Sequence, residues 1–345
     1  MATKHTHFDS TEFNTLRNSA IPAAIMASPN TRFDSAEEAS VFFARELDHV
    51  KAKTYDVEYP ELTALSNFPI SSEADAGDNT ITYYTYDKTG LAKVIDNYST
   101  DLPRADVTGK PSIALIKSVG DSYGYSAQEM RASRRAGKSL DVRKAESARY
   151  QIDNLINKIA WRGDEESGLM GVLSAGQNIP LYTITAGADS SKTTWLEKTA
   201  DEILLDVNGM QKQVAKVTKN VERPDTLCVP ADVYMDISTR RIPDTSTTVK
   251  AFLLEHAPYL KEIISTAELD ADSVDTNPYA KATGGQGVAF LFKNDPMKLT
   301  LENPMPFYQY PLQVRNLETV IPCEARTAGV IVYYPLSALI AVGVS

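Results

Sequence analysis

The residue types that carry most metal and nucleophile chemistry are sparse in this sequence. Its four histidines are His5, His7, His49 and His256. His5 and His7 could share a metal ion on an extended segment, but no further histidine, and no cysteine pair at the spacing of zinc ligands, completes a four-ligand site. Cys228 and Cys323 stand in apolar, strand-like contexts, which favours buried free thiols. We therefore expect no metal site.

Carboxylates are the abundant reactive groups. They cluster as Glu37 with Glu38, Asp164 with Glu165 and Glu166, and Asp270 with Asp272. An acid–base enzyme needs two carboxyl groups on opposite sides of a cleft, and adjacency in the sequence does not provide that arrangement. No phosphate-binding loop, dinucleotide fingerprint or nucleophile elbow occurs, and the glycines of residues 284–287 favour a flexible loop. We expect no catalytic residue and no cofactor, and a hydrolase with unrecognised carboxylates stays open as a remote alternative.

Composition narrows the class of protein. The 345 residues suggest about two domains, and 43% hydrophobic with 23% charged residues is typical of a globular chain. The net charge of -10 disfavours tight nucleic-acid binding, which usually requires a basic patch. The most apolar stretch, residues 328–344, is interrupted by polar residues, proline and glycine, so no membrane segment is expected. Because the first residues lack a signal peptide, we expect a cytoplasmic protein.

The first third of the chain divides into an arm and a β-rich segment. Residues 1–53 are polar and irregular apart from one short helix, which begins at a capping box formed by Ser35 and Glu38. Residues 54–125 are rich in strand-forming residues, above all in the run Ile-Thr-Tyr-Tyr-Thr-Tyr at 81–86. Because these strands are polar and flank a turn-rich tip, we expect an extended hairpin that packs against another surface.

The strongest helical pattern covers residues 126–161. It begins at a capping box of Ser126 and Glu129, is interrupted at Gly137 and restarts after Asp141. Spacings of three and four residues then predict one apolar face, formed by Ala145, Ala148, Ile152, Leu155, Ile156 and Ile159. The helix is long enough to run along a whole domain.

The remainder predicts a mixed block and a strand-rich tail. We expect a helix over residues 194–219 that is capped by Thr194 and Glu197, and further helices over 231–240 and 247–260. Strands are expected over 226–229 and 288–292, with 297–301 as a partner strand of the latter. Helices and strands occur in blocks without regular alternation, so the fold class is α+β.

Several motifs around the long helix resemble those of one protein family. They are a Tyr-Ser-x-x-Glu start at 125–129, a Gly-x-x-Leu-Asp step at 137–141, a Gly-Asp-x-x-x-Gly-Leu-x-Gly exit at 163–171, and a Thr-Ala-Gly turn before a Tyr-Pro-x-Ser ending at 327–337. They are similar to the major capsid proteins of tailed bacteriophages, which have the Hong Kong 97-type fold. The resemblance runs from about residue 54 to the end and is most specific over 120–173 and 323–338.

The resemblance implies a domain division and a function. Residues 1–53 would be an N-terminal arm, 54–125 an extended loop over a neighbouring subunit, 126–190 and 295–330 a peripheral domain with its spine helix, and 191–294 with 331–345 an axial domain. The chain would be a non-enzymatic structural subunit of an icosahedral virion. It would form pentamers and hexamers and enclose DNA without reading its sequence. An encapsulin-type nanocompartment shell protein is the nearest alternative.

The same resemblance indicates partners and contact residues. Scaffolding, decoration and portal proteins are candidate partners, and assembly would take place in the cytoplasm of the bacterial host. For the contacts between subunits we single out tyrosines of the loop and basic residues at the start of the helical region. These candidates are Tyr83, Tyr84, Tyr86, Arg131, Arg134, Arg135 and Lys138. A solvated helix face is the simpler interpretation of the basic residues, since exposed ion pairs contribute under about 1 kcal/mol each.

Overall fold

The computed structural model describes residues 59–94, 104–136, 143–279 and 285–345. Residues Tyr59–Ser345 form one compact unit, and Met1–Glu58 are assigned to a separate unit. The arm expected over residues 1–53, with its capping box at Ser35, therefore lies outside the described residues, as does Lys138.

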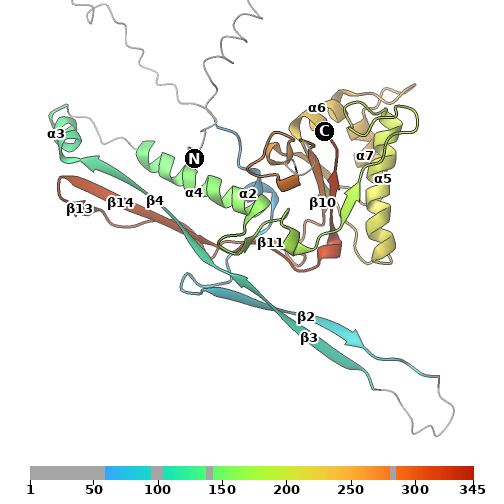
Figure 1. Ribbon diagram of the computed structural model, residues 1–345, viewed down its shortest axis with the longest axis horizontal. Coiled ribbons are helices and arrows are strands. Elements are labelled where there is room, and N and C mark those ends of the chain that lie inside the picture. The colour runs from blue at the N-terminus through green and yellow to red at the C-terminus, as the bar shows by residue number, and fades with distance from the viewer. Residues whose placement is uncertain (1–58, 95–103, 137–142, 280–284) are drawn as a thin grey trace, which may run out of the picture. The chain divides into compact units, whose positions relative to one another are not determined.

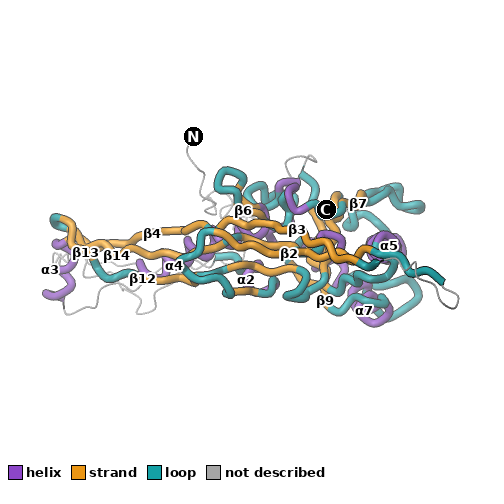
Figure 2. The backbone as a smooth tube through the Cα atoms, turned by 90° about the horizontal axis from the view of Figure 1, so that it is seen from below, coloured by secondary structure: helices purple, strands orange, loops and turns teal. Residues whose placement is uncertain are grey.

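A long antiparallel sheet is centred on strand β14 (Glu318–Thr327). Strand β4 (Lys117–Ser126) pairs with the whole of β14 on one side, and β12 (Met305–Gln309) and β13 (Gln313–Arg315) follow each other along its other side. Figure 2 shows β4 and β14 running side by side. Alternate residues of these strands, among them Val119 and Cys323, pack on the long helix α4 (Arg143–Arg162). The β-rich segment expected over 54–125 therefore ends in a strand of this sheet.

The helical region follows the predicted pattern in two pieces. Helix α3 (Ala127–Ala136) begins at the expected capping box, in which Ser126 Oγ accepts from the Glu129 N–H at 3.1 Å and the Glu129 carboxylate accepts from the Ser126 N–H at 2.9 Å. Helix α4 has 20 residues and, at 1.5 Å per residue, is about 30 Å long. Its buried face contains Ile152, Ile156 and Ile159. Leu155, which the periodicity placed on the same face, is 45% exposed.

A small second sheet explains the glycines of the exit and turn motifs. Its strand order is β1 (Ile70–Ser71), β11 (Leu299–Glu302), β15 (Gly329–Val332), β6 (Leu169–Met170) and β5 (Gly163–Asp164). Gly163 has a φ of 81°, and a Cβ there would lie 2.7 Å from the backbone nitrogen of Gly171. Gly329 has a φ of 71°, and a Cβ would collide with the carbonyl oxygen of Met170. Only glycine fits both positions without strain.

The third sheet lies in the mixed block. Its order is β7 (Leu181–Thr183), β16 (Ala338–Val342), β10 (Val288–Phe292), β8 (Thr226–Val229) and β9 (Glu262–Ser265). The residues Leu227, Ala289 and Leu291 belong to the core shared with helices α5 (Ala200–Val217), α6 (Ala231–Thr239) and α7 (Val249–His256). On the opposite face, Phe290 and Phe292 pack with Trp161 of α4. Figure 1 shows these helices around the sheet at one end of the unit.

Two local predictions for this block are wrong. Helix α5 begins at Ala200 and not near Thr194, because the capping box is formed by Thr199 and Glu202. Thr194 and Glu197 do contact each other, at 3.2 Å, but in a turn before the helix. Strand β11 was expected to pair with residues 288–292. It pairs instead with β15, and β10 lies between β16 and β8.

Residues 267–275, which we call the strap, connect the mixed block to α4 by side-chain contacts. The strap begins with the 3-10 helix η4 (Ala267–Leu269). The buried Glu268 carboxylate accepts from Asn157 Nδ2 of α4 at 2.6 Å and from the Thr63 hydroxyl of α2 (Thr63–Asn67) at 2.7 Å. Further along the strap, Asp275 pairs with Lys158 at 3.4 Å. Two further 3-10 turns, η3 (Ala175–Gln177) and η5 (Pro335–Ser337), complete the described elements.

Candidate intersubunit surfaces

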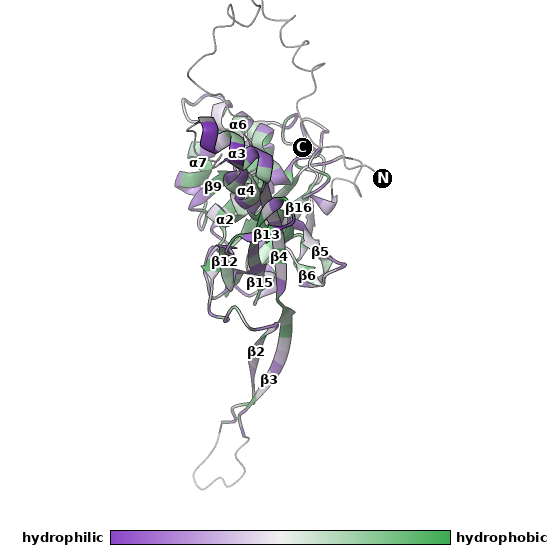
Figure 3. Ribbon diagram, turned by 90° about the vertical axis from the view of Figure 1, so that its left-hand side faces the viewer, coloured by the Kyte–Doolittle hydropathy of each residue, from purple (hydrophilic) through white to green (hydrophobic). Residues whose placement is uncertain are grey.

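Two strands leave the compact part of the unit as a ribbon of their own. Strands β2 (Thr80–Thr89) and β3 (Asp106–Leu115) pair antiparallel, from Thr80 opposite Leu115 to Thr89 opposite Asp106. They form a two-stranded sheet, so each has one unpaired edge within the described residues. Figures 1 and 3 show the ribbon standing clear of the other sheets. An isolated two-stranded ribbon is at best marginally stable in water, so this one needs a further surface to pack on.

The two faces of the ribbon differ in polarity. Directly opposed residues share a face, so Thr80, Lys88 and Gly109 lie on the same face as a mostly apolar set. This set consists of Thr82, Tyr84, Tyr86, Val107, Pro111, Ile113 and Leu115. Its large apolar side chains are exposed, Tyr86 by 69% and Ile113 by 66%. We call these residues the apolar ribbon face. Burying each such side chain is worth about 1.5 to 3 kcal/mol, which makes the face a strong candidate for contact with another molecule.

The other ribbon face is largely polar and in part turned toward its own chain. It carries Ile81 and Tyr83 opposite Ala114 and Ser112. The Tyr83 ring packs edge-on against Tyr333, with the ring centres 5.1 Å apart. The three tyrosines predicted as contact residues are therefore divided, with Tyr84 and Tyr86 on the apolar ribbon face and Tyr83 half-buried on the opposite one.

The tyrosines of the apolar ribbon face are held in place by the ribbon itself. The rings of Tyr84 and Tyr86 are stacked, with centres 6.3 Å apart and planes 20° apart. The Tyr86 ring covers the backbone of Gly109 on the opposite strand, where a Cβ would lie 2.8 Å from a ring carbon. An aromatic ring over a cross-strand glycine shields the backbone and fixes the register of the pair.

Helix α3 carries the predicted basic residues at the end of the long sheet, and it packs chiefly on β4. Arg131, Arg134 and Arg135 follow at i, i+3 and i+4 and so share one face of the helix. Arg134 and Arg135 are exposed, and none of the three arginines makes an ion pair with a described residue. The salt bridge in this region joins Glu129 to Lys144 at 3.3 Å. Hydrogen bonds from Ser126 and this lysine lower the pKa of Glu129.

Sequence reasoning missed several apolar residues of these surfaces. Beside α3, β13 exposes Val314 and the residues flanking this strand expose Leu312 and Leu317. The Leu317 carbonyl accepts from the Ala127 N–H at 2.7 Å. On the ribbon, Val107 and Ile113 were also missed. Alternation was the available signal, because residues 106, 108, 110 and 112 are polar whereas 107, 111, 113 and 115 are apolar.

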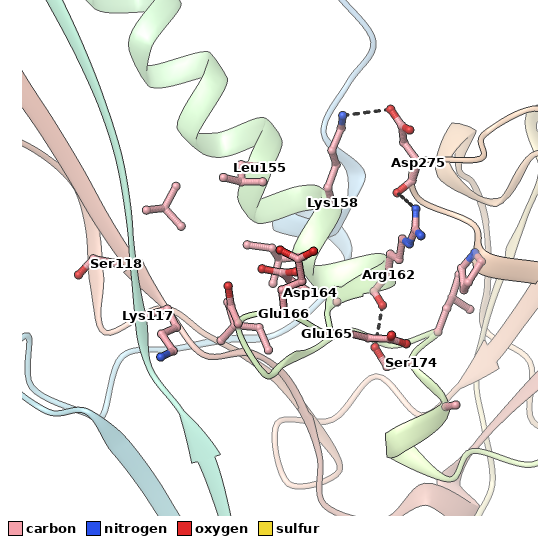
Figure 4. A pocket seen from close by; sticks show the side chains of 18 of the residues that line it. Lys117, Ser118, Leu155, Lys158, Arg162, Asp164, Glu165, Glu166, Ser174 and Asp275 are labelled. Carbon is pink, nitrogen blue, oxygen red and sulfur yellow. Dashed lines mark hydrogen bonds and ion pairs between the residues drawn. The ribbon is translucent and has the colours of Figure 1, made fainter. Parts of the chain in front are cut away.

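A groove of about 760 Å³ lies between β4 and α4 and is closed at one end by the turn from β5 to β6. Its lining includes the apolar Val119, Leu155 and Ile159, and also the acidic residues 164–166 at the end of β5 and the start of the turn. Figure 4 shows Asp164 and Glu166 between Lys117 of β4 and Arg162 of α4. The lining offers carboxylates and lysines but neither histidine nor cysteine.

The remaining reactive groups of the described residues lie apart. Cys228 and Cys323 are both buried free thiols, and burial raises the pKa of each. No group of three or more potential metal ligands gathers in the described part of the chain. Among the described helices, none is long and apolar enough to cross a membrane.

Solved phage capsids share this fold. The capsid of Myoviridae phage XM1 matches with a TM-score of 0.72 and 16% identity, covering 89% of this chain and 100% of that one. A Mycobacterium phage Ogopogo structure matches with a TM-score of 0.57 and 12% identity over 86% and 96% of the two chains. The capsid of a native GTA particle gives 0.60 and 9% identity over 91% and 100%. The comparison with curated proteins gives no match.

The family assignment comes from the sequence. The model of the family described as "Major capsid protein" matches residues 90–344, which is well over half of the chain. The Hong Kong 97-type fold expected from the motifs is confirmed, and the encapsulin and hydrolase alternatives are not favoured. The chain belongs to the major capsid protein family and is a structural, non-enzymatic subunit of an icosahedral phage head.

Proposed function

We propose that the subunit assembles into a shell through contacts with neighbouring subunits, and that the apolar ribbon face forms the principal contact. The observation that carries this is the exposure of Tyr84, Tyr86, Val107 and Ile113 on a single face of a ribbon without a core of its own. Soluble proteins rarely leave such a face open unless it binds something. In the assembled shell a neighbouring subunit covers it.

The second contact element is helix α3. Its exposed arginines, Arg131, Arg134 and Arg135, are free to form ion pairs with another subunit. Lys138 is part of the same proposal by its place in the sequence. Each exposed pair contributes under about 1 kcal/mol, but a closed shell repeats every contact many times.

The domain division belongs to the same proposal. Residues 1–53 act as the arm, 54–125 as the extended loop, 126–190 and 295–330 as the peripheral domain, and 191–294 with 331–345 as the axial domain. Within the loop segment β2 and β3 form the separate ribbon, whereas β4 joins the long sheet on α4. In this arrangement the axial domains surround the centres of pentamers and hexamers. The separate cores of the α5–α7 block and the α4-covered sheet support the division of the last two.

The wall encloses the double-stranded DNA genome without sequence-specific binding. A net charge of -10 supports this role, because an acidic wall does not hold the phosphate backbone tightly. Scaffolding, decoration and portal proteins are the proposed further partners, and the bacterial host cytoplasm is the proposed place of assembly.

Negative-stain electron microscopy of the purified, overexpressed protein tests this proposal. We expect closed shells, tubes or capsomer rings from the wild type, and only small particles from the double variant Tyr84→Ser, Ile113→Ser. The variant leaves the contact between Tyr86 and Gly109 intact. The control is Thr85→Ser with Lys110→Ser, a directly opposed pair on the other ribbon face, which should assemble as the wild type does. Normal shells from the apolar-face variant would refute the role of that face.

A further inference from the structure

The β4–α4 groove has an excess of acidic groups that the described chain does not neutralise. Asp164, Glu165 and Glu166 form the only run of three consecutive acidic residues in the sequence. Asp164 ends β5, and Glu165 and Glu166 begin the turn to β6. None of them forms an ion pair with a described residue. Glu165 and Glu166 are exposed.

The cations of the groove are in part already engaged. Lys158 pairs with Asp275 at 3.4 Å, and the Arg162 guanidinium donates to the carbonyl oxygens of Val274 and Asp275 at 3.2 and 3.4 Å. Figure 4 shows both side chains turned toward Asp275 and away from the acidic turn. Lys117, on the β4 side, is the remaining cation of the lining. The groove therefore suits a cationic occupant.

The groove also has an apolar floor. Leu155 of α4 is 45% exposed and lies beside Val119 and Ile159 in the lining. This arrangement suits arginine, because its aliphatic stem can cover an apolar surface while the guanidinium reaches a carboxylate. Arginine and carboxylate also match in geometry, since the planar guanidinium can donate two parallel hydrogen bonds.

We infer that the arginines of helix α3 of one subunit occupy the acidic groove of a second copy. The inference rests on the proposed function and names the partner surface of α3. Three arginines on one helix face would meet three consecutive carboxylates, of which Asp164 ends β5 and two lie in the turn, so the charges are complementary in sign and number. The contact joins two different surfaces and is therefore heterologous, the type that closes into rings when the rotation between copies permits.

A second copy of the subunit fits the α3 arginines better than other partners do, because it also supplies a cationic occupant for the acidic groove. A duplex of DNA would meet the α3 arginines but leave the acidic groove without an occupant. A contact between α3 helices of two copies would bring like charges together. Of these three pairings, that of α3 with the groove is the one that provides a partner of opposite charge for both surfaces.

A charge-swap experiment on the full chain tests the inference. The basic reversal is Arg134→Glu with Arg135→Glu, the acidic reversal is Glu165→Arg with Glu166→Arg, and the third variant combines all four changes. We expect each reversal alone to raise the protein concentration needed for shell formation by about tenfold or more, and the combination to restore most of that loss. The concentration is read from sedimentation of assembled particles.

Two controls make the result specific. Lys212→Glu with Lys216→Glu reverses two exposed charges of α5 and should leave assembly near the wild type. Thermal unfolding of the unassembled subunits should be unchanged in every variant, because the altered side chains are exposed. Failure of the wild type to form any particle would instead count against the proposed function itself.

The inference is overturned if the basic reversal assembles normally, or if the combined variant assembles no better than the two reversals. Normal shells with a reduced DNA content in the basic reversal would also overturn it, since that result would assign the arginines to the genome.

Discussion

The apolar residues of the α5–α7 block are buried in one core, whereas the large apolar side chains of the β2–β3 ribbon are exposed on one face. In the block, Leu227, Leu291 and the helices α5 to α7 bury one continuous core, and the buried Lys198 and Asp206 pair with each other. In the ribbon, Tyr84, Tyr86 and Ile113 stay exposed on one face. The apolar side chains of the block are therefore already buried in the single subunit, whereas those of the ribbon would be buried only on assembly.

The largest expected effect on the free energy of unfolding lies in the block. Lys198 and Asp206 form a buried ion pair at 2.6 Å, and Asp206 also accepts from Trp195 Nε1 at 3.0 Å. Lys198→Met would leave a buried carboxylate without its cation, which costs about 3 to 5 kcal/mol. Denaturant unfolding of the unassembled subunit measures the loss. A change below about 1 kcal/mol would mean that the block is not held by its internal contacts.

A smaller effect is expected where the block meets the strap. Burial, aided by the charge of Asp232, raises the pKa of Asp270 to about 6, and one of its carboxylate oxygens is buried without a hydrogen-bond partner. An unfolded aspartate has a pKa of about 3.9, so the folded state binds the proton more tightly. Ionising Asp270 therefore lowers the free energy of unfolding. This loss is absent below about pH 4, grows as the pH rises toward 6, and is complete above that value.

Asp270→Asn removes this loss. The variant should be more stable than the wild type by about 1 kcal/mol at pH 7.5, a figure reduced for partial solvent screening, and equally stable at pH 4. Thermal unfolding at the two pH values gives the comparison. A variant that is less stable at pH 7.5 would show that the carboxylate is stabilised by its surroundings.

The smallest effect on subunit stability is expected in the ribbon. Tyr84→Ser with Ile113→Ser should change the free energy of unfolding by less than about 0.5 kcal/mol, because both side chains are exposed in the single subunit. The same pair of changes should abolish particle formation. A loss of 2 kcal/mol or more in the unassembled subunit would contradict the contrast between the two regions.

The sequence predicted elements whose signals are local. The capping box of Ser126 and Glu129 marks the start of α3, and the fully apolar run at 288–292 has the bounds of β10. The pairing of the strands was harder to predict from the sequence. Residues of β10 are buried on both faces and have no period of two, so nothing local distinguished β16 and β8 from β11 as neighbours.

The candidate surfaces were predicted only in part. The tyrosines and arginines were found by residue type, but type alone could not separate Tyr83 from Tyr84, which depends on the face that each residue occupies. Gly109 and Pro111 gave strand β3 the composition of a turn, and this concealed the alternation that places Val107 and Ile113 beside Tyr86. Leu155 followed the helical period, yet it lines a groove that only the placement of β4 creates.

The most direct test of the account is a high-resolution cryo-electron microscopy map of the assembled shell. We predict that the apolar ribbon face, with Tyr84, Tyr86 and Ile113, lies buried against a neighbouring subunit at every equivalent position. A map in which this face is open to solvent, with the shell held together by other surfaces, would contradict it.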